Sequence, residues 1–180
     1  NQCISCHSQH DKYVPIGPTA ANLNRLFHYA QGEENQLAYL KRNKLLNAVP
    51  DPETIETMAA FDEPGSGNLD QRVRAYLAVN CAHCHSPGGN ARTTGLDLRL
   101  TQNDPAKIGV WRTPVAAGRG SGGRSYDIVP GAPEKSILMH RLQSSDLAAR
   151  MPNIGNRIVH QEAVDLIQKW ISEMEPTRSE

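Results

Sequence analysis

The stretch Asn80-Cys81-Ala82-His83-Cys84-His85 organises this sequence, because it contains the pattern Cys-x-x-Cys-His. The same pattern occurs at Cys3-Ile4-Ser5-Cys6-His7, and the two copies together use all four cysteines of the chain. Cys-x-x-Cys-His is the attachment signature of c-type haem. On a helical turn the two thiols match the spacing of the two porphyrin vinyl groups, and the following histidine points at the iron. The sequence therefore predicts two covalently attached haems, held by Cys3, Cys6, Cys81 and Cys84, with His7 and His85 as iron ligands.

Other uses of the four cysteines stay open at this point. Two Cys-x-x-Cys pairs can hold one zinc ion, and such pairs also occur as disulfides or as redox-active dithiols. None of these uses explains why a histidine follows the second cysteine in both copies. Covalent haem is therefore the favoured interpretation.

Length and composition fit small haem-binding units better than one large globule. The chain has 180 residues, of which 38% are hydrophobic and only 5% aromatic. A porphyrin is itself a large apolar body, and its burial supplies core that the side chains lack. The formal net charge is zero, so there is no basic field for nucleic acid. No stretch is apolar enough to cross a bilayer, so we also expect no membrane-spanning role.

The beginning of the chain bears on where the protein works. It contains no signal peptide, and the first motif starts only two residues in. Haem is attached to cysteines outside the bacterial cytoplasm. We therefore expect an exported protein, periplasmic or extracellular, that has been processed or is the haem-bearing part of a longer chain.

Helical periodicity is clearest around the second motif. Asn68 or Ser66 is suited to cap a helix over residues 69–80, which leads directly into Cys81. A terminal helix is expected from residue 161 to about 174. Residues 33–46 are rich in good helix formers and are predicted to form another helix. Residues 64–67, Pro-Gly-Ser-Gly, are the clearest linker signal in the chain.

The first motif is followed by a polar loop, by Ile16-Gly17-Pro18-Thr19 and by the apolar residues Leu23, Leu26 and Phe27. This order resembles class I cytochromes c. The resemblance implies that the Pro18 carbonyl accepts a hydrogen bond from the His7 ring and so orients that ligand. The second copy lacks the Gly-Pro pair, which leaves the partner of His85 unidentified.

The resemblance covers the chain in two copies and implies an all-α fold: two tandem cytochrome c-like units, few or no strands, and long loops wrapping the haems. Residues 1–67 would form the first unit, which lacks the helix before its motif. Residues 68–180 would form a second, complete unit. The run from Arg74 to His85, with residues 95–99 and 129–131, looks more narrowly like an uncharacterised family of secreted bacterial dihaem cytochrome c proteins. In that family the cytochrome part often ends a longer chain.

The sixth ligand of each iron decides its chemistry. Methionine sulfur suits electron transfer, whereas an open position permits ligand binding or peroxide chemistry. Met151, followed by a proline and then the terminal helix, resembles the distal loop of class I cytochromes c and is the predicted ligand of the second iron. Met58 is the candidate for the first iron. His28 is its rival, and Met58 also suits a packed core.

These features together predict a dihaem c-type cytochrome that transfers electrons between redox protein partners, and they favour a carrier over an enzyme. A peroxidase-like haem enzyme is one alternative, and it requires one open iron in place of ligation by Met58. A subunit of a larger multihaem assembly is the other, because another chain could complete the first unit.

Overall fold

The computed structural model describes residues 3–49, 51–154 and 158–176, and the chain divides into two compact units. One unit joins Asn1–Pro15 to Ala60–Glu180 and therefore contains both Cys-x-x-Cys-His motifs. The other unit is Ile16–Ala59. The division does not follow the expected boundary after residue 67, and residues 1–67 contribute to both compact units. Whether residues 1–67 and 68–180 act as two haem-binding units stays a prediction.

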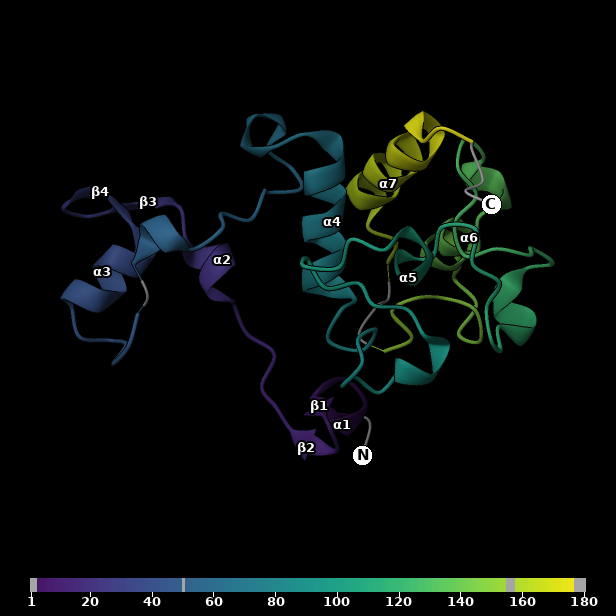
Figure 1. Cartoon of the computed structure of the whole chain (residues 1–180), viewed down its shortest axis with the longest axis horizontal. Helices are drawn as coiled ribbons and strands as arrows, with labels where there is room; N and C mark the ends of the chain where they lie inside the picture. The colour runs from purple at the N-terminus through teal and green to yellow at the C-terminus, as the bar shows by residue number, and fades with distance from the viewer. Residues whose placement is uncertain (1–2, 50, 155–157, 177–180) are drawn as a thin grey trace. The chain divides into compact units, whose positions relative to one another are not determined.

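Helix α4 (Leu69–Asn80) confirms the helix expected before the second motif (Figure 1). Its start is specified locally by a capping box. The Asn68 side chain accepts from the Gln71 backbone N–H, and the Gln71 side chain accepts from the Asn68 N–H, both at 2.9 Å. Val73 and Leu77 are fully buried on its inner face. The helix ends at Cys81, whose N–H still donates to the Leu77 carbonyl at 2.9 Å. The second motif therefore begins on a rigid, core-anchored helix.

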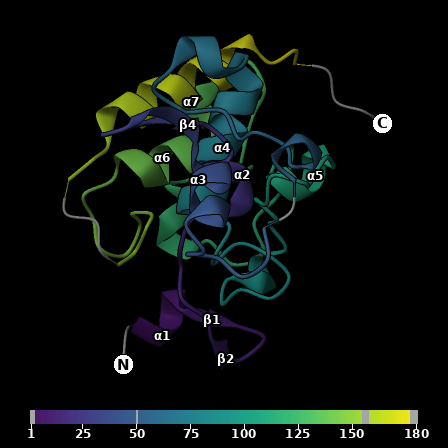
Figure 2. The same ribbon diagram turned by 90° about the vertical axis from the view of Figure 1, so that its left-hand side faces the viewer.

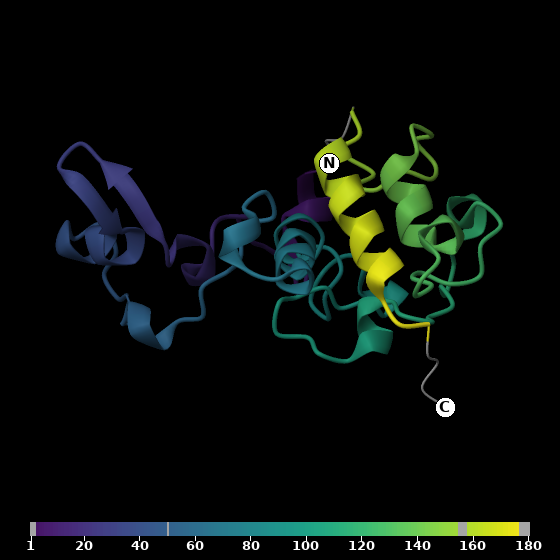
Figure 3. The same cartoon turned by 90° about the horizontal axis from the view of Figure 1, so that it is seen from above.

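Helix α7 (Gln161–Glu173) confirms the predicted terminal helix to within one residue. It packs against α4 and against α6 (Ile137–Gln143), and Figure 3 shows α6 and α7 side by side. The Trp170 indole N–H donates to the Asp70 carboxylate at 2.9 Å and ties α7 to α4. The buried core of this unit is formed by Val73, Leu77, Ala82, Leu98, Ile108, Ile128, Met139, Leu142, Val164, Ile167, Trp170 and Ile171. Within the described residues, no helix combines the length and hydrophobicity that crossing a membrane would require.

Long loops with single short turns connect these helices. The turns are η2 (Pro64–Ser66), η3 (Arg92–Thr94), α5 (Pro105–Ile108), η4 (Gly118–Ser121) and η5 (Pro133–Lys135). The loop after the second motif is held by Arg74 of α4. Its guanidinium donates to the carbonyls of Arg99 at 2.9 Å and of Gln102 at 2.5 Å. A buried cation thus replaces regular secondary structure in satisfying these backbone carbonyls.

The all-α prediction is wrong, because the chain also forms two small antiparallel sheets. In the first sheet β1 (Ser8–Gln9) pairs with β2 (Lys12–Tyr13), directly after the first motif (Figure 2). The two residues between them, His10 and Asp11, have φ of 50° and 59°. A two-residue turn with both φ values positive matches the twist of paired strands and favours a hairpin.

The second sheet lies in the unit Ile16–Ala59, which also contains α2 (Ala20–Leu23) and η1 (Pro52–Thr54). Strand β3 (Leu26–Tyr29) pairs with β4 (Gly32–Asn35), and α3 (Gln36–Arg42) follows. The helix predicted over residues 33–46 is therefore shorter, and its first three residues belong to a strand. Aromatic residues favour strands, and Tyr29 stacks on Tyr39 with ring centroids 3.7 Å apart. Asn35 ends the strand and caps α3 by accepting from the Leu37 N–H at 2.9 Å.

Candidate functional site

The second motif continues from α4 as one further turn of helix. The backbone N–H groups of Cys84 and His85 both donate to the Cys81 carbonyl, at 3.1 and 2.8 Å. This turn keeps the two thiols and the histidine that follows them on neighbouring positions of one turn. Dense packing raises the pKa of the Cys81 thiol to about 12, although the residue keeps some exposed surface. Burial likewise raises the pKa of the Cys84 thiol to about 11, so both thiols are protonated at neutral pH.

The His85 ring is held by a hydroxyl that follows it in the next loop. His85 Nδ1 lies 3.3 Å from Thr94 Oγ1, and the Thr94 hydroxyl donates its own hydrogen to the Ala91 carbonyl at 2.7 Å. Oγ1 can therefore only accept from the ring, and this assigns the proton of His85 to Nδ1. The lone pair is then on Nε2, which is the tautomer that a metal ligand of this kind requires.

His85 is also neutral in this environment. Burial, together with the nearby Arg141 and His83, lowers its pKa to about 4. A neutral imidazole is the form that binds a metal ion. The Leu98 N–H donates to the His85 carbonyl at 2.9 Å and fixes the backbone as well. His85 is thus oriented and uncharged before any ligand is bound.

The first motif forms the short helix α1 (Cys3–Cys6), and the His7 N–H donates to the Cys3 carbonyl at 3.0 Å. The His7 ring stacks on Tyr13 of β2 with centroids 5.7 Å apart. His7 Nδ1 is buried, and it has no hydrogen-bond partner within the part of the chain that the structure describes. An unpaired buried polar atom of this kind costs about 1–3 kcal/mol. A hydrogen-bond acceptor for Nδ1 would remove this cost and orient the ring.

The structure brings the two motifs together, although 78 positions separate corresponding residues in the sequence. The His10 N–H donates to the Gly88 carbonyl at 2.9 Å, and the Asn90 side chain donates to the Ile4 carbonyl at 3.0 Å. A Cβ atom on Gly88 would lie 2.7 Å from the exposed His10 ring, so a larger residue here would require the His10 side chain to move. These two hydrogen bonds thus help to hold the first motif beside the second.

Met151 lies in the same unit, on the loop after α6. Its N–H donates to the Arg141 carbonyl at 3.0 Å, and the Arg141 side chain in turn donates to the Ala149 carbonyl at 2.9 Å. The positive charge of Arg141 also contributes to the lowered pKa of His85. Arg141 thus holds the Met151 loop through its backbone carbonyl and its side chain. Ligation of the second iron by Met151 stays a prediction.

The remaining predicted site residues, Met58, Pro18 and the rival His28, lie in the unit Ile16–Ala59. Met58 is buried, and its sulfur accepts a hydrogen bond from the Asn22 side chain at 2.9 Å. Pro18 is exposed within its unit. The His28 ring is exposed and lies 3.3 Å from Glu33. Their predicted roles toward His7 stay predictions.

Three buried donor atoms in the loops that follow the second motif fit a group that carries carboxylates, such as the haem propionates. Trp111 Nε1, Arg112 Nε and Arg150 Nε are buried, and none has a hydrogen-bond partner among the described residues. Arg112 also donates to the Thr94 carbonyl at 3.1 Å, and Thr94 is the residue whose hydroxyl contacts His85. Arg150 directly precedes Met151. Carboxylates placed here would satisfy donors that are otherwise costly to bury.

Sequence reasoning missed several of these residues. Thr94 was not among the predicted site residues, because nothing in the sequence indicated its contact with His85. His83 occupies one of the two unspecified positions of Cys-x-x-Cys-His, yet the structure groups it with Cys6 and Cys84. A tryptophan and an arginine in a polar stretch are ordinary surface residues until their burial is known.

Comparison of the chain with family models, with curated proteins and with solved structures finds no match.

Proposed function

We propose that this protein is a dihaem c-type cytochrome that passes electrons between redox protein partners. The observation that carries the proposal is the second motif, in which Cys81 and Cys84 share a turn with a histidine that is partly buried, neutral and protonated at Nδ1. A carrier of this type works outside the cytoplasm, where haem is attached, so we propose a periplasmic or extracellular location.

Each haem would be bound by thioether bonds from one cysteine pair and would supply an iron that changes oxidation state by one electron. The protein's own residues would orient the iron ligands, bury the porphyrin and balance the charge of its carboxylates. Thr94 fixes the tautomer of His85, and Arg112, which donates to the Thr94 carbonyl, would offer positive charge to the propionates. The adjacency of the two motifs supports passage of an electron from one attachment site to the other.

One observation favours a second candidate, a haem enzyme with one open iron. The Met58 sulfur already accepts a hydrogen bond from Asn22 inside the unit Ile16–Ala59. A sulfur engaged in this way is less available to an iron at His7. If no other residue replaced it, the first iron would keep a position for peroxide or another small ligand.

The test is the optical spectrum of the oxidised protein in the region of the methionine-to-iron charge-transfer band. We expect two low-spin haems in the wild type, and loss of the band at one haem in Met151→Ala. Met58→Ala decides between the two candidates, with the buried Met139→Ala as the control for loss of an internal methionine. Loss of the band at the other haem would support the carrier. A high-spin first haem in the wild type, unchanged in Met58→Ala, would support the enzyme. A protein without covalently bound haem would refute both.

A further inference from the structure

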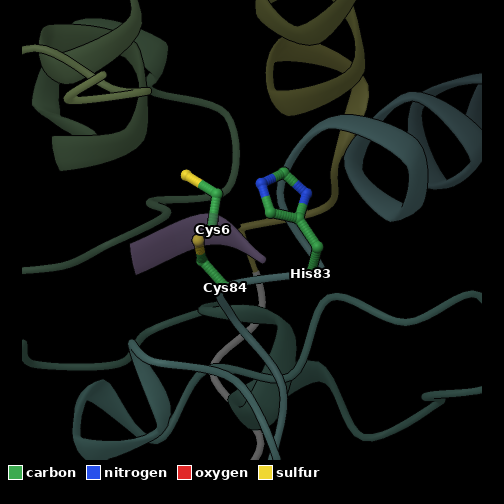
Figure 4. A group of neighbouring side chains, drawn as sticks. All are labelled: Cys6, His83 and Cys84. Atoms are coloured by element: carbon green, nitrogen blue, oxygen red, sulfur yellow. The ribbon is translucent and has the colours of Figure 1, made fainter. Parts of the chain in front are cut away.

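Three side chains from the two motifs form one group. Cys6 Sγ, Cys84 Sγ and a ring nitrogen of His83 all lie within 4.8 Å of one another, and all three residues are partly buried (Figure 4). Cys6 comes from α1, whereas His83 and Cys84 come from the turn after α4. The group therefore exists only because the N-terminal segment packs against the second motif.

The donor atoms of this group match a borderline-soft cation. Thiolate and imidazole are the usual ligands of Zn²⁺, with distances of about 2.3 Å to sulfur and about 2.0–2.1 Å to nitrogen. In a tetrahedral site these distances place neighbouring ligand atoms roughly 3.4–3.8 Å apart. Separations of at most 4.8 Å can close to that range by small side-chain rotations. Three protein ligands leave the fourth tetrahedral position to water.

The membership of the group distinguishes it from an ordinary Cys-x-x-Cys metal site. Such a site would pair Cys3 with Cys6 and Cys81 with Cys84. Here Cys3 is exposed and outside the group, and Cys81 is outside it as well. Each motif instead contributes one thiol, and the imidazole comes from the variable position of the second motif. This membership predicts which substitutions weaken metal binding and which leave it nearly unchanged.

We propose that the haem-free chain binds a single Zn²⁺ through Cys6, His83 and Cys84, with the two thiols losing their protons as the ion binds. The site goes beyond the proposed function, because it needs only free thiols. It also has a consequence for that function. Haem attachment would convert both thiols to thioethers, so zinc and haem would exclude each other at these cysteines. Zinc would then delay or block attachment until it is removed.

The test uses the full-length chain, reduced and without haem, titrated with Co²⁺ as a spectroscopic substitute for Zn²⁺. We expect one equivalent to bind, with thiolate-to-cobalt charge-transfer bands and tetrahedral d–d bands, and Zn²⁺ to displace it. Cys6→Ser, Cys84→Ser and His83→Ala should each weaken binding by roughly 10-fold or more, whereas the matched controls Cys3→Ser and Cys81→Ser should change it by less than about 3-fold. Circular dichroism of each chain reports whether helix content is retained.

Alkylation of the wild-type thiols gives a second measurement that needs no variant. Zinc should slow the modification of Cys6 and Cys84, read by peptide mass spectrometry, and leave the rates at Cys3 and Cys81 unchanged. Equal protection of all four thiols, two bound ions, or no effect of His83→Ala would overturn the proposal, as would failure to bind Co²⁺. None of these results bears on haem attachment, which is read separately from the mass and spectrum of the loaded protein.

Discussion

At the scale of single residues, the best-defined part of the site is the pair His85 and Thr94. The Thr94 hydroxyl donates to the Ala91 carbonyl and therefore accepts from His85 Nδ1. This arrangement sets the tautomer of a ligand whose pKa burial has lowered to about 4. A hydrogen-bond acceptor on Nδ1 makes the imidazole a stronger donor to iron, and a stronger donor favours the ferric state.

Replacement of Thr94 by valine should therefore raise the reduction potential of the haem that we propose at Cys81 and Cys84. Loss of a hydrogen bond worth about 1 kcal/mol corresponds to roughly 40 mV for one electron. Thr94→Ser keeps the hydroxyl and is the matched control. Potentiometric titration followed by optical spectroscopy measures both. An equal shift in the serine variant, which keeps the hydroxyl, would show that the shift does not come from loss of the hydrogen bond.

At the scale of elements, hydrogen bonds to one buried carboxylate hold the loop after the second motif in place. Asp97 accepts from Arg99 at 2.8 and 2.6 Å and from the Gln102 side chain at 3.0 Å. The neighbouring Leu98 N–H donates to the His85 carbonyl. The hydrogen bonds from Arg99 hold the pKa of Asp97 at about 2, below its ordinary value of 3.8.

This lowered pKa predicts a pH-dependent contribution to stability. The folded state favours the ionised Asp97. The contribution of Asp97 to the free energy of unfolding is therefore complete above about pH 4 and is lost as the pH falls toward 2. The pKa difference corresponds to about 2 kcal/mol, and solvent screening of the half-exposed Arg99 reduces this to about 1–2 kcal/mol. Asp97→Asn should lower the free energy of unfolding by this amount at pH 7 and by little at pH 2.

Denaturant unfolding followed by circular dichroism, repeated between pH 7 and pH 2, measures this difference. Asp62→Asn makes the same change of charge at an exposed position and should leave the stability nearly unchanged. A gap between wild type and Asp97→Asn that stays constant over this pH range would contradict the linkage and indicate a purely steric effect.

At the scale of the whole molecule, the two motifs belong to one compact unit and have neighbouring thiols. If each motif carries a haem, the two irons must influence each other electrostatically. An electron on one haem opposes the arrival of a second electron on the other. For charges roughly 10 Å apart at an effective dielectric constant of about 20, this repulsion is about 1.7 kcal/mol, or roughly 70 mV.

Single-haem variants test this coupling. Cys81→Ser with Cys84→Ser leaves only the first haem, and Cys3→Ser with Cys6→Ser leaves only the second. We expect the sum of their two redox titration curves to be narrower than the wild-type curve. Each variant lacks the neighbouring haem, so no electron on that haem opposes reduction of the one that remains. A sum that superimposes on the wild-type curve would show that the two haems are electrostatically independent.

Sequence patterns predicted best those features that depend on residues close together in the chain. Helix α4 has its cap, its inner stripe and its ending within about a dozen residues, and it was predicted correctly. The strand β4 was not, because residues 33–35 are good helix formers that pair instead with β3. Pairing across a hairpin overrode local propensity there, and the all-α prediction failed for the same reason.

By itself, the sequence determined the chemistry available to this protein: two thiol pairs, each followed by a histidine, and the helix that presents the second of them. Only the tertiary structure decided which atoms surround these groups. Thr94 beside His85, the unpaired donors of Trp111 and Arg112, and the approach of Cys6 to Cys84 all depend on how loops fold back. Helical hydrogen bonds join residues four apart and leave a periodic signature. Contacts across 78 residues leave none, because no local spacing encodes them.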